Sequence, residues 1–282
     1  MVSLNVFLLG QSICFKKVLK KNNERNFKMR FKDKSIVITG GAGGIGCALA
    51  ETFSKDGGKV MVSDLSETGC KEICEKLIQK NRTIDYYSGN LTEKSYCESL
   101  IAHTVQKYGS IDVLINNAGI IPRGPILQTT DEMWHSALDV NLTAVFYLCR
   151  AAIPHMQKQG GGAIVNTSSM WGVYPGPDHL AYCTSKGALA TFTKCLARDY
   201  APDLIRVNAV CPFEVNTPML RTGFKIRNLD PDKAIETLNA TVPLGRISEP
   251  EDIADVIAFL ASDEARYIAG ECIEISGAKA VY

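Results

Sequence analysis

The feature that most constrains the fold is a regular alternation of two kinds of segment after residue 34. Short runs rich in β-branched residues alternate with longer segments of helical period, which is typical of βαβ units and a parallel sheet. The alternation predicts seven strands, at residues 35–39, 59–63, 83–88, 112–116, 163–167, 205–210 and 271–275. It predicts helices at approximately 44–55, 67–80, 93–107, 131–158, 180–200 and 250–261. We therefore expect an α/β fold with a doubly wound, mostly parallel seven-stranded sheet and helices on both faces.

The alternation contains no linker and no internal repeat, so residues 29–282 are expected to form a single domain. A hydrophobic fraction of 46% provides enough apolar material for a sizeable core. Only residues 213–242 break the pattern, with Pro218, Gly223 and Pro231 among apolar residues. We expect this stretch to be a mobile flap of short helices at one edge of the fold.

Residues 1–28 differ from the rest of the chain. An apolar stretch at 2–15 precedes a run of basic residues, which inverts the charge order of a secretory signal. The stretch is also too short to span a bilayer. A basic leader poor in acidic residues could be an organelle address, but Met29 opens a run that leads directly into the first strand. We expect a disordered extension or an upstream start codon, and a cytoplasmic protein.

Charge and cysteine content limit the classes of partner. A formal net charge of +1 offers no basic field for nucleic acid or anionic lipid, so a small-molecule partner is expected, with no nucleic acid and no membrane. The ten cysteines are scattered through the expected helices and strands, which indicates reduced thiols in a core. Cys70 and Cys74 stand one helical turn apart, but no second pair of ligand spacing accompanies them, so we expect no metal.

A glycine-rich turn joins the first expected strand to the first helix. Gly40, Gly44 and Gly46 follow the pattern Thr-Gly-x-x-x-Gly-x-Gly, with Ile45 between the last two. Glycines at such a turn let the main chain approach a pyrophosphate at the helix N-terminus. A tight turn without ligand is the alternative, but the position directly after a buried strand favours dinucleotide binding and a Rossmann-type fold.

Asp64 ends the second expected strand and is followed by Leu65. A carboxylate at this place can accept hydrogen bonds from the adenosine ribose hydroxyls and would repel the 2′-phosphate of NADP. No Arg or Lys stands nearby to pair with that phosphate. Asp64 could instead cap the next helix, a role that Ser66 could equally fill. We expect NAD as the cofactor, with NADP disfavoured.

Tyr182 and Lys186 stand four residues apart in a strongly helical segment, so they share one helix face. The ammonium group and a nicotinamide cation are expected to lower the pKa of the phenol from its usual value of about 10 and to make Tyr182 a general acid/base. Such a pair is common by chance when it stands alone. Here it follows the glycine turn, five expected strands and the pair Ser168-Ser169.

Together these motifs resemble the short-chain dehydrogenase/reductase family, over nearly all of residues 32–278. The resemblance implies four catalytic residues: Asn141, Ser169, Tyr182 and Lys186. In the family, the serine hydrogen-bonds the substrate oxygen, the lysine holds the cofactor ribose, and the asparagine holds a water on the proton path behind the lysine. Ser168 falls one place out of the family spacing.

The same resemblance implies cofactor contacts beneath the adenine, at the ribose and at the nicotinamide, made by Asn90, Leu91, Asn117, Ala118, Gly119, Tyr182, Lys186, Pro212, Val215 and Thr217. It also implies a homotetramer that packs through helices 131–158 and 180–200. Two departures are visible: Phe213 stands where the family commonly has Gly, and residues 276–278 replace the frequent Asp-Gly-Gly. Neither departure removes a catalytic group.

The expected activity is hydride transfer between NAD and a secondary alcohol or ketone. Polar side chains from three separated segments, Arg123, Trp171, His179 and Glu214, are expected at the substrate. Each alone is usually solvated surface, but their convergence favours a sugar, polyol or hydroxy acid over a steroid. Two alternatives stay open: a 3-oxoacyl thioester reductase, which Asp64 and the near-neutral charge disfavour, and a non-catalytic NAD sensor, which the intact catalytic set disfavours.

Overall fold

Seven parallel strands form one sheet in the order β3-β2-β1-β4-β5-β6-β7. The strands are β1 Ser35–Thr39, β2 Lys59–Ser63, β3 Ile84–Tyr86, β4 Val113–Asn116, β5 Gly162–Thr167, β6 Ile205–Pro212 and β7 Cys272–Ile275. The expected doubly wound sheet is confirmed, and every neighbouring pair is parallel. The strand order reverses between β1 and β4, and in such sheets ligands bind outside the carboxyl ends of the strands at this switch point.

The computed structural model describes residues 29–279. The chain divides into two compact units, residues 1–30 and residues 31–282, and all of the described helices and strands belong to the second. The basic extension expected at 1–28 lies outside the described residues.

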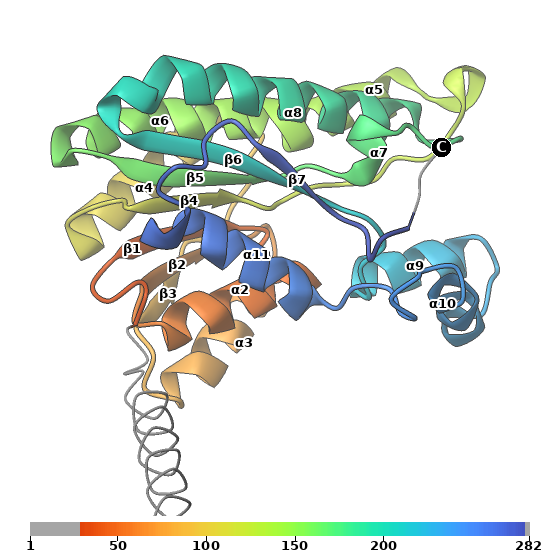
Figure 1. Ribbon diagram of the computed structural model, residues 1–282, viewed down its shortest axis with the longest axis horizontal. Helices are drawn as coiled ribbons and strands as arrows, with labels where there is room; N and C mark the ends of the chain where they lie inside the picture. The colour runs from red at the N-terminus through yellow and green to blue at the C-terminus, as the bar shows by residue number, and fades with distance from the viewer. Residues whose placement is uncertain (1–28, 280–282) are drawn as a thin grey trace, which may run out of the picture. The chain divides into compact units, whose positions relative to one another are not determined.

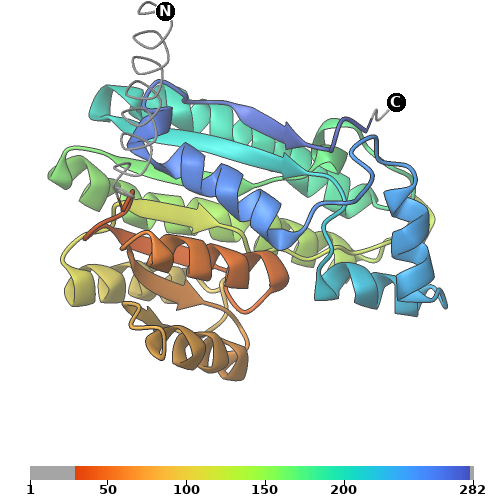
Figure 2. The ribbon, with the colours of Figure 1, turned by 60° about the horizontal axis from the view of Figure 1, so that its bottom comes forward.

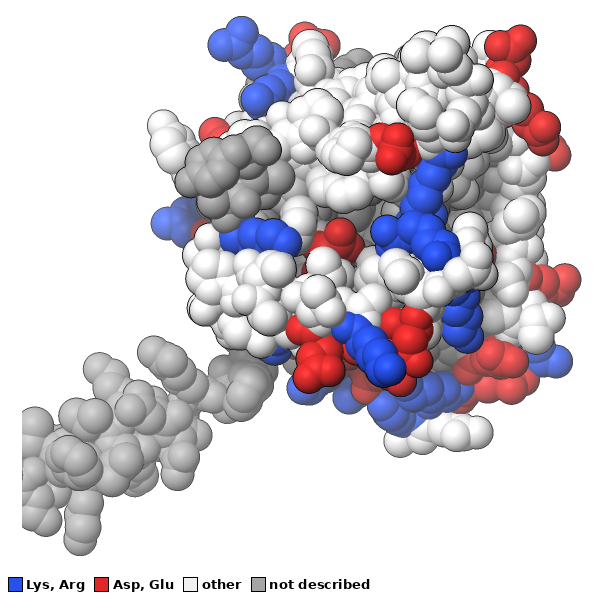
Figure 3. Space-filling view, turned by 90° about the vertical axis from the view of Figure 1, so that its right-hand side faces the viewer, with Lys and Arg blue, Asp and Glu red and all other residues white. Residues whose placement is uncertain are grey.

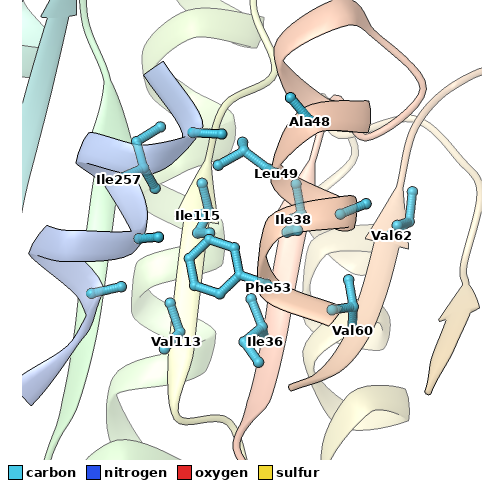
Figure 4. Packing of buried hydrophobic residues seen from close by; sticks show 14 of the residues in the cluster. Ile36, Ile38, Ala48, Leu49, Phe53, Val60, Val62, Val113, Ile115 and Ile257 are labelled. Atoms are coloured by element: carbon cyan, nitrogen blue, oxygen red, sulfur yellow. The ribbon is translucent and has the colours of Figure 1, made fainter. Parts of the chain in front are cut away.

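Helices cover both faces of the sheet (Figures 1 and 2). On one face lie α2 Gly44–Lys55, α3 Glu67–Ile78 and α11 Pro250–Ala261, and on the other lie α4 Lys94–Tyr108, α6 Ala144–Gln159 and α8 Leu180–Tyr200. The alternation along β1 explains this arrangement, because Ile36 and Ile38 point into the first layer and Val37 into the second. Figure 4 shows Phe53 of α2 and Ile257 of α11 packed over Ile36 and neighbouring strands.

Most element boundaries agree with the expectations to within two residues. The expected helix 67–80 ends early, at Ile78, because the chain turns at Asn81, whose φ of 57° is left-handed. The expected strand 83–88 is reduced to Ile84–Tyr86 at the sheet edge. Within residues 29–279 the cysteines are all free thiols, and most of them are buried.

The expected helix 131–158 is interrupted. It consists of α5 Asp131–Leu138, a π-helical turn η2 Asp139–Thr143, and α6. Asn141 lies in the π turn, and its side chain hydrogen-bonds both main-chain groups of Ile120. Single π turns inside helices often occur at functional sites. The interruption escapes a hydrophobic-periodicity argument because one extra residue shifts the phase of the pattern only locally.

The continuous stretch Asp131–Gln159 is long and apolar enough to cross a membrane by length and composition, with a mean hydropathy of 1.2 in its most apolar window. Only 44% of that window is buried. Leu148 and Ala152 of α6 lie in the core, whereas Phe146 is 42% exposed. The helix therefore packs on the sheet, and on its outer side the exposed ring of Phe146 lies under the guanidinium of Arg150, at 4.6 Å.

The segment 213–242 carries α9 Pro218–Ile226 and α10 Pro231–Asn239, the two short helices at one end of the ribbon in Figure 1. A single turn, α7 Met170–Val173, lies between β5 and α8 and was not expected. Three short 3-10 turns complete the described elements: η1 Ile126–Gln128, η3 Ala201–Asp203 and η4 Asp263–Ala265.

Candidate active site

A cavity of about 560 Å³ lies at the carboxyl ends of the strands. Figure 3 looks onto this end of the fold. Most of the expected site residues line the cavity: Gly40, Gly44, Ile45, Asp64, Leu65, Asn90, Leu91, Asn117, Ala118, Gly119, Arg123, Ser169, Trp171, His179, Tyr182, Lys186, Pro212, Glu214, Val215 and Thr217. Gly46 and Asn141 do not reach its wall.

The glycine turn packs too tightly for side chains. Gly40 has a φ of 65°, and a Cβ built on it would lie 2.8 Å from the Cα of Ala118. A Cβ on Gly46 would lie 2.0 Å from the main-chain oxygen of Gly40, so Gly46 lets α2 approach the turn and does not itself face a ligand. The N-cap of α2, Gly43, makes no side-chain cap hydrogen bond. The turn thus offers main-chain N–H groups to the cavity, as a pyrophosphate site requires.

Asn117 fixes the glycine turn to the end of β4. Its Nδ2 donates to the main-chain oxygens of Thr39 and Gly40, at 3.1 and 3.3 Å. In return, the Oγ1 of Thr39 accepts hydrogen bonds from the N–H groups of Asn117 and Ala118, at 3.0 and 3.2 Å. These bonds hold the two strands that flank the switch point in a fixed relation.

Asp64 binds the glycine turn from the other side. Its Oδ2 accepts a hydrogen bond of 3.1 Å from the N–H of Ala42, and its Oδ1 accepts one of 3.0 Å from the N–H of Ser66. Ser66 caps α3, because its hydroxyl accepts from the N–H of Gly69. Ser66 therefore fills the capping role, and the carboxylate of Asp64 lies on the cavity wall beside the exposed Leu65.

Tyr182 lies in the first turn of α8, facing Ser169 at the end of β5. Burial raises the pKa of Tyr182 to about 12, and the neighbouring Ser169 hydroxyl lowers it by a smaller amount. The expected lowering is therefore wrong for the protein alone. The ammonium of Lys186 donates its hydrogen bond to a main-chain oxygen at the end of β5. Ser169 also caps α7 by accepting from the N–H of Trp171, at 3.1 Å.

Lys186 is only 3% exposed. Its Nζ donates a hydrogen bond of 2.7 Å to the main-chain oxygen of Thr167, and burial lowers its pKa to about 8. The hydroxyl of Ser168 donates to the main-chain oxygen of Lys186, at 2.8 Å. Ser168 thus anchors α8 to β5, a structural use that separates it from Ser169.

Asn141 lies behind Lys186 and is fully buried. Its Nδ2 donates to the Ile120 oxygen and to the hydroxyl of Ser185, both at 3.0 Å, and its Oδ1 accepts from the Ile120 N–H at 2.9 Å. A Cβ built on Gly119 would lie 3.2 Å from both this Oδ1 and the Nζ of Lys186. Gly119 therefore lies directly against both functional groups.

Three of the expected substrate residues lie near Tyr182 on two different loops. The rings of Trp171 and His179 meet edge to face at 4.3 Å, and His179 lies 6.5 Å from the Tyr182 ring. The Nδ1 of His179 bonds the oxygen of Pro177 at 2.7 Å, and burial lowers its pKa. The loop that carries Arg123 is held to the His179 loop by a short parallel bridge.

Comparison with known proteins agrees with this geometry. A family model described as "Enoyl-(Acyl carrier protein) reductase" matches residues 40–277. The 3-oxoacyl-[acyl-carrier-protein] reductase of Thermotoga maritima is 39% identical over 249 residues, which cover 88% of this chain and 98% of that protein. The chain belongs to the short-chain dehydrogenase/reductase family. It is thus an oxidoreductase of a family that uses a nicotinamide cofactor.

Other members of the short-chain dehydrogenase/reductase family are similar to a comparable degree. The 3alpha-hydroxysteroid dehydrogenase of Mediterraneibacter gnavus is 37% identical over 252 residues, 89% of this chain and 98% of that protein. The ligand-free structure of aldohexose dehydrogenase from Thermoplasma acidophilum has a TM-score of 0.80 at 35% identity, and the match covers 87% and 93% of the two chains. The family resemblance drawn from the motifs is confirmed.

Several cavity residues of this family member escaped the sequence argument: Ala42, Gly43, Gly89, Thr92, Ile120, Ile121, Val140, Thr167, Ser168, Phe213, Pro218, Met219, Leu220 and Arg227. Phe213 was noted only as a departure from the family; its ring packs under the Nζ of Lys279, at 4.7 Å. Arg227 is the one charged residue of the set. The sequence signal that could have indicated Arg227 as a cavity residue was its position in the expected flap, one helical turn after Gly223. Residues 29–279 contain no group of three or more His, Cys, Asp or Glu side chains suited to a metal.

Proposed function

We propose that the protein is an NAD-dependent oxidoreductase that transfers a hydride between the nicotinamide and a secondary alcohol or ketone. The observation that carries the proposal is the meeting of Ser169, Tyr182 and Lys186 on the wall of one cavity whose other end is the glycine turn. A proton-exchanging phenol and a dinucleotide cradle in one cavity are what hydride transfer requires.

The cavity fits a dinucleotide. The main chain at Gly40 has room only for hydrogen at its Cα, and the first turn of α2 has no side-chain cap. We infer that the glycine turn holds the pyrophosphate, that Asn90 and Leu91 lie under the adenine, and that Val215 and Thr217 contact the carboxamide. Asp64, held at the wall by Ala42, supports NAD over NADP because its charge opposes a 2′-phosphate.

Each catalytic side chain has a separate task in this proposal. The bound cofactor supplies a two-electron hydride acceptor or donor. Tyr182 exchanges the proton of the substrate oxygen at its Oη, and Ser169 donates a hydrogen bond to that oxygen. Lys186 holds the ribose, and Asn141 anchors a water on the proton path. Because burial raises the pKa of Tyr182 to about 12, the phenol of the protein alone keeps its proton at neutral pH and is ready to protonate a ketone oxygen.

The substrate end favours a polar molecule such as a sugar, polyol or hydroxy acid. Arg123, His179 and Glu214 line the cavity beside Tyr182, and an apolar substrate would leave the buried Nε of Arg123 without a hydrogen-bond partner. The aldohexose dehydrogenase of Thermoplasma acidophilum, at 35% identity, shows by its name that a similar fold can act on a sugar.

A 3-oxoacyl thioester reductase is the second candidate. It is favoured by the 39% identity to the Thermotoga maritima reductase. The candidate predicts preference for NADPH, which Asp64 opposes. A non-catalytic NAD sensor would bind NADH and turn nothing over.

We also propose that residues 29–282 act as one catalytic domain with a substrate flap at 213–242, in a cytoplasmic homotetramer. Phe146, a large apolar side chain of α6 that is 42% exposed, supports association through the helices within 131–158 and 180–200.

A substrate screen tests the activity directly. NADH formation is followed spectroscopically with sugars, sugar acids, polyols and hydroxysteroids, and NADH or NADPH consumption is followed with an acetoacetyl thioester. Turnover of a polar secondary alcohol with NAD supports the proposal. Efficient turnover of the thioester with NADH or NADPH, without turnover of the polar alcohols, establishes the second candidate, and NADH binding without any turnover establishes the sensor.

A further inference from the structure

Two arginines converge on the substrate end of the cavity. Arg123 follows β4, Arg227 follows α9, and both line the wall that also carries Tyr182. Both are organised around Gly223 of α9. A Cβ built on Gly223 would lie 2.6 Å from the Nη2 of Arg123, and the Nε of Arg227 donates to the Gly223 oxygen at 3.1 Å. The absence of a side chain at this position leaves room for the first guanidinium beside the second.

The two guanidinium groups have unused hydrogen-bonding capacity. The Nε of Arg123 is buried and has no hydrogen-bond partner among the described residues. Within residues 29–279 neither arginine forms an ion pair with a carboxylate. Arg227 instead packs over the ring of Phe224, at 5.0 Å. Arg123 is partly buried, whereas Arg227 is exposed. A partly buried guanidinium without an anionic partner costs free energy that a bound carboxylate would recover through charge-assisted, bidentate hydrogen bonds.

The charge balance of the wall is positive. The field of the Glu214 carboxylate acts on Arg123, and Arg227 acts on Arg123 as a like charge. Glu214 itself faces three cations, Arg123, Arg227 and Lys279. One carboxylate therefore does not neutralise the group, and a second negative charge is favoured there.

The position of Arg123 separates this feature from the cofactor cradle. Its charge acts on Tyr182, Glu214 and His179, whereas Asp64 and the glycine turn form the adenosine end. The two arginines are therefore placed to bind the substrate, which reacts at Tyr182, and not the cofactor.

We propose that the substrate carries a carboxylate, which Arg123 and Arg227 bind while its secondary alcohol or ketone lies at Tyr182. This inference rests on the proposed function. It narrows the substrate class to hydroxy acids and sugar acids, and it makes the two arginines specificity-determining residues.

Matched pairs of probes test the inference: D-gluconate against D-glucitol, glycerate against glycerol, and 3-hydroxybutyrate against 1,3-butanediol. The members of each pair differ by a carboxylate in place of CH2OH. Binding to the protein with NADH is measured by calorimetry, and turnover is measured with NAD. In the wild type, at least one acid should bind about 10- to 100-fold more tightly than its alcohol, as expected for charge-assisted hydrogen bonds. No preference for an acid in any pair would overturn the inference, as would tighter binding of glycerol 3-phosphate than of every acid.

Variants at Arg123 and Gly223 then test whether the preference depends on the Arg123 guanidinium. Arg123→Gln should remove most of the preference for the acid over its matched alcohol, mainly by raising the KM of the acid. The affinity and the KM of the alcohol should change by less than about 3-fold. Gly223→Ala, which displaces the Arg123 guanidinium, should likewise weaken binding of the acid probe. Arg266→Gln, at an exposed arginine outside the cavity, is the matched control and should leave both probes unchanged. An unaltered acid preference in Arg123→Gln contradicts the assignment.

The binding measurement keeps this inference distinct from the proposed function. Arginine-dependent binding of an acid without turnover contradicts the oxidoreductase proposal and leaves the carboxylate site standing. Equal turnover of acids and alcohols contradicts the carboxylate site and leaves the oxidoreductase proposal standing.

Discussion

Lys186 places its Nζ 2.7 Å from the main-chain oxygen of Thr167, in a position where only 3% of the side chain is exposed. One neutral carbonyl is a weak partner for a buried ammonium group. The bond nevertheless fixes the amine at the end of β5, four residues after Tyr182 on α8. The contact therefore positions the amine, while burial of the charged ammonium lowers the free energy of unfolding.

That cost should appear as a pH-dependent stability. Burial lowers the pKa of Lys186 from 10.5 to about 8, so between these values the unfolded state binds one more proton than the native state. The free energy of unfolding should therefore rise with pH over this window, by roughly 3 kcal/mol in total. Below pH 8 Lys186 is protonated in both the native and the unfolded state, so the full destabilisation by the buried ammonium is present.

The measurement is urea unfolding at pH 7 and pH 10. From pH 7 to pH 10, the wild type should gain about 2 to 3 kcal/mol relative to Lys186→Met. Lys71→Met, at an exposed lysine, should show no such difference from the wild type. Parallel pH profiles for the wild type and Lys186→Met would contradict the buried ammonium.

The alternation of β1 illustrates what the sequence could predict. Ile36, Val37 and Ile38 alternate between the two layers of the core, and a period of two is visible in the residues themselves. The glycine turn and Tyr182 with Lys186 are likewise local patterns. Their convergence on one cavity follows from the parallel order of the strands, which brings all carboxyl ends to one edge.

Other features depend on packing that no local pattern carries. The expected lowering of the Tyr182 pKa does not hold for the protein without cofactor, because burial of the phenol, a tertiary property, raises it. The π turn at Asn141 depends on its bonds to Ile120. Arg227 reaches the cavity because α9 folds over it, and a position in a flap does not reveal which way a side chain points.

Gly119→Ala should damage turnover. Its Cβ would meet the Lys186 Nζ and the Asn141 Oδ1 at 3.2 Å, and both atoms are held by their own hydrogen bonds. A shift of a few tenths of an ångström in these groups should lower kcat by about 10-fold or more. The variant should keep a thermal midpoint near that of the wild type. Unchanged kcat would show that the contact does not position the catalytic groups.

Asp64 should decide the cofactor preference. In the wild type NADH should bind more tightly than NADPH, and the opposite order in a titration would end the assignment to NAD. Asp64→Asn keeps an acceptor for the Ala42 N–H but removes the charge, so discrimination should fall by about 10-fold. Asp64→Ala removes the hydrogen-bond acceptor as well. It should reduce the difference in affinity between NADH and NADPH and should also weaken NADH binding.

Light scattering should give a homotetramer, four times the 30.8 kDa chain. Phe146→Asp replaces an exposed apolar side chain of α6 with a charged one and should yield smaller species. Ile78→Asp, at a residue of α3 that is 54% exposed, should leave the assembly intact. A monomer mass for the wild type at micromolar concentration would refute the tetramer.

Tyr182→Phe separates catalysis from cofactor binding. The substitution removes the phenol oxygen and its proton while the ring, α8 and the glycine turn stay in place. NADH binding should survive, and turnover should fall by at least about 100- to 10,000-fold, as is typical for a lost general acid/base. Tyr267→Phe, at a fully exposed tyrosine, is the matched control and should retain wild-type turnover. Lys186→Ala should instead weaken both turnover and cofactor affinity, because this lysine is proposed to hold the ribose.

The pH profile adds a second readout for Tyr182. Because burial raises the pKa of the phenol to about 12, it is protonated at neutral pH, and alcohol oxidation requires its deprotonation. Oxidation should therefore accelerate as the pH rises, whereas ketone reduction, which uses the protonated form, should not. A bound nicotinamide cation would move the alkaline limb to lower pH by favouring the phenolate. Near-normal turnover in Tyr182→Phe, with the alkaline limb still present, would show that another group exchanges the proton.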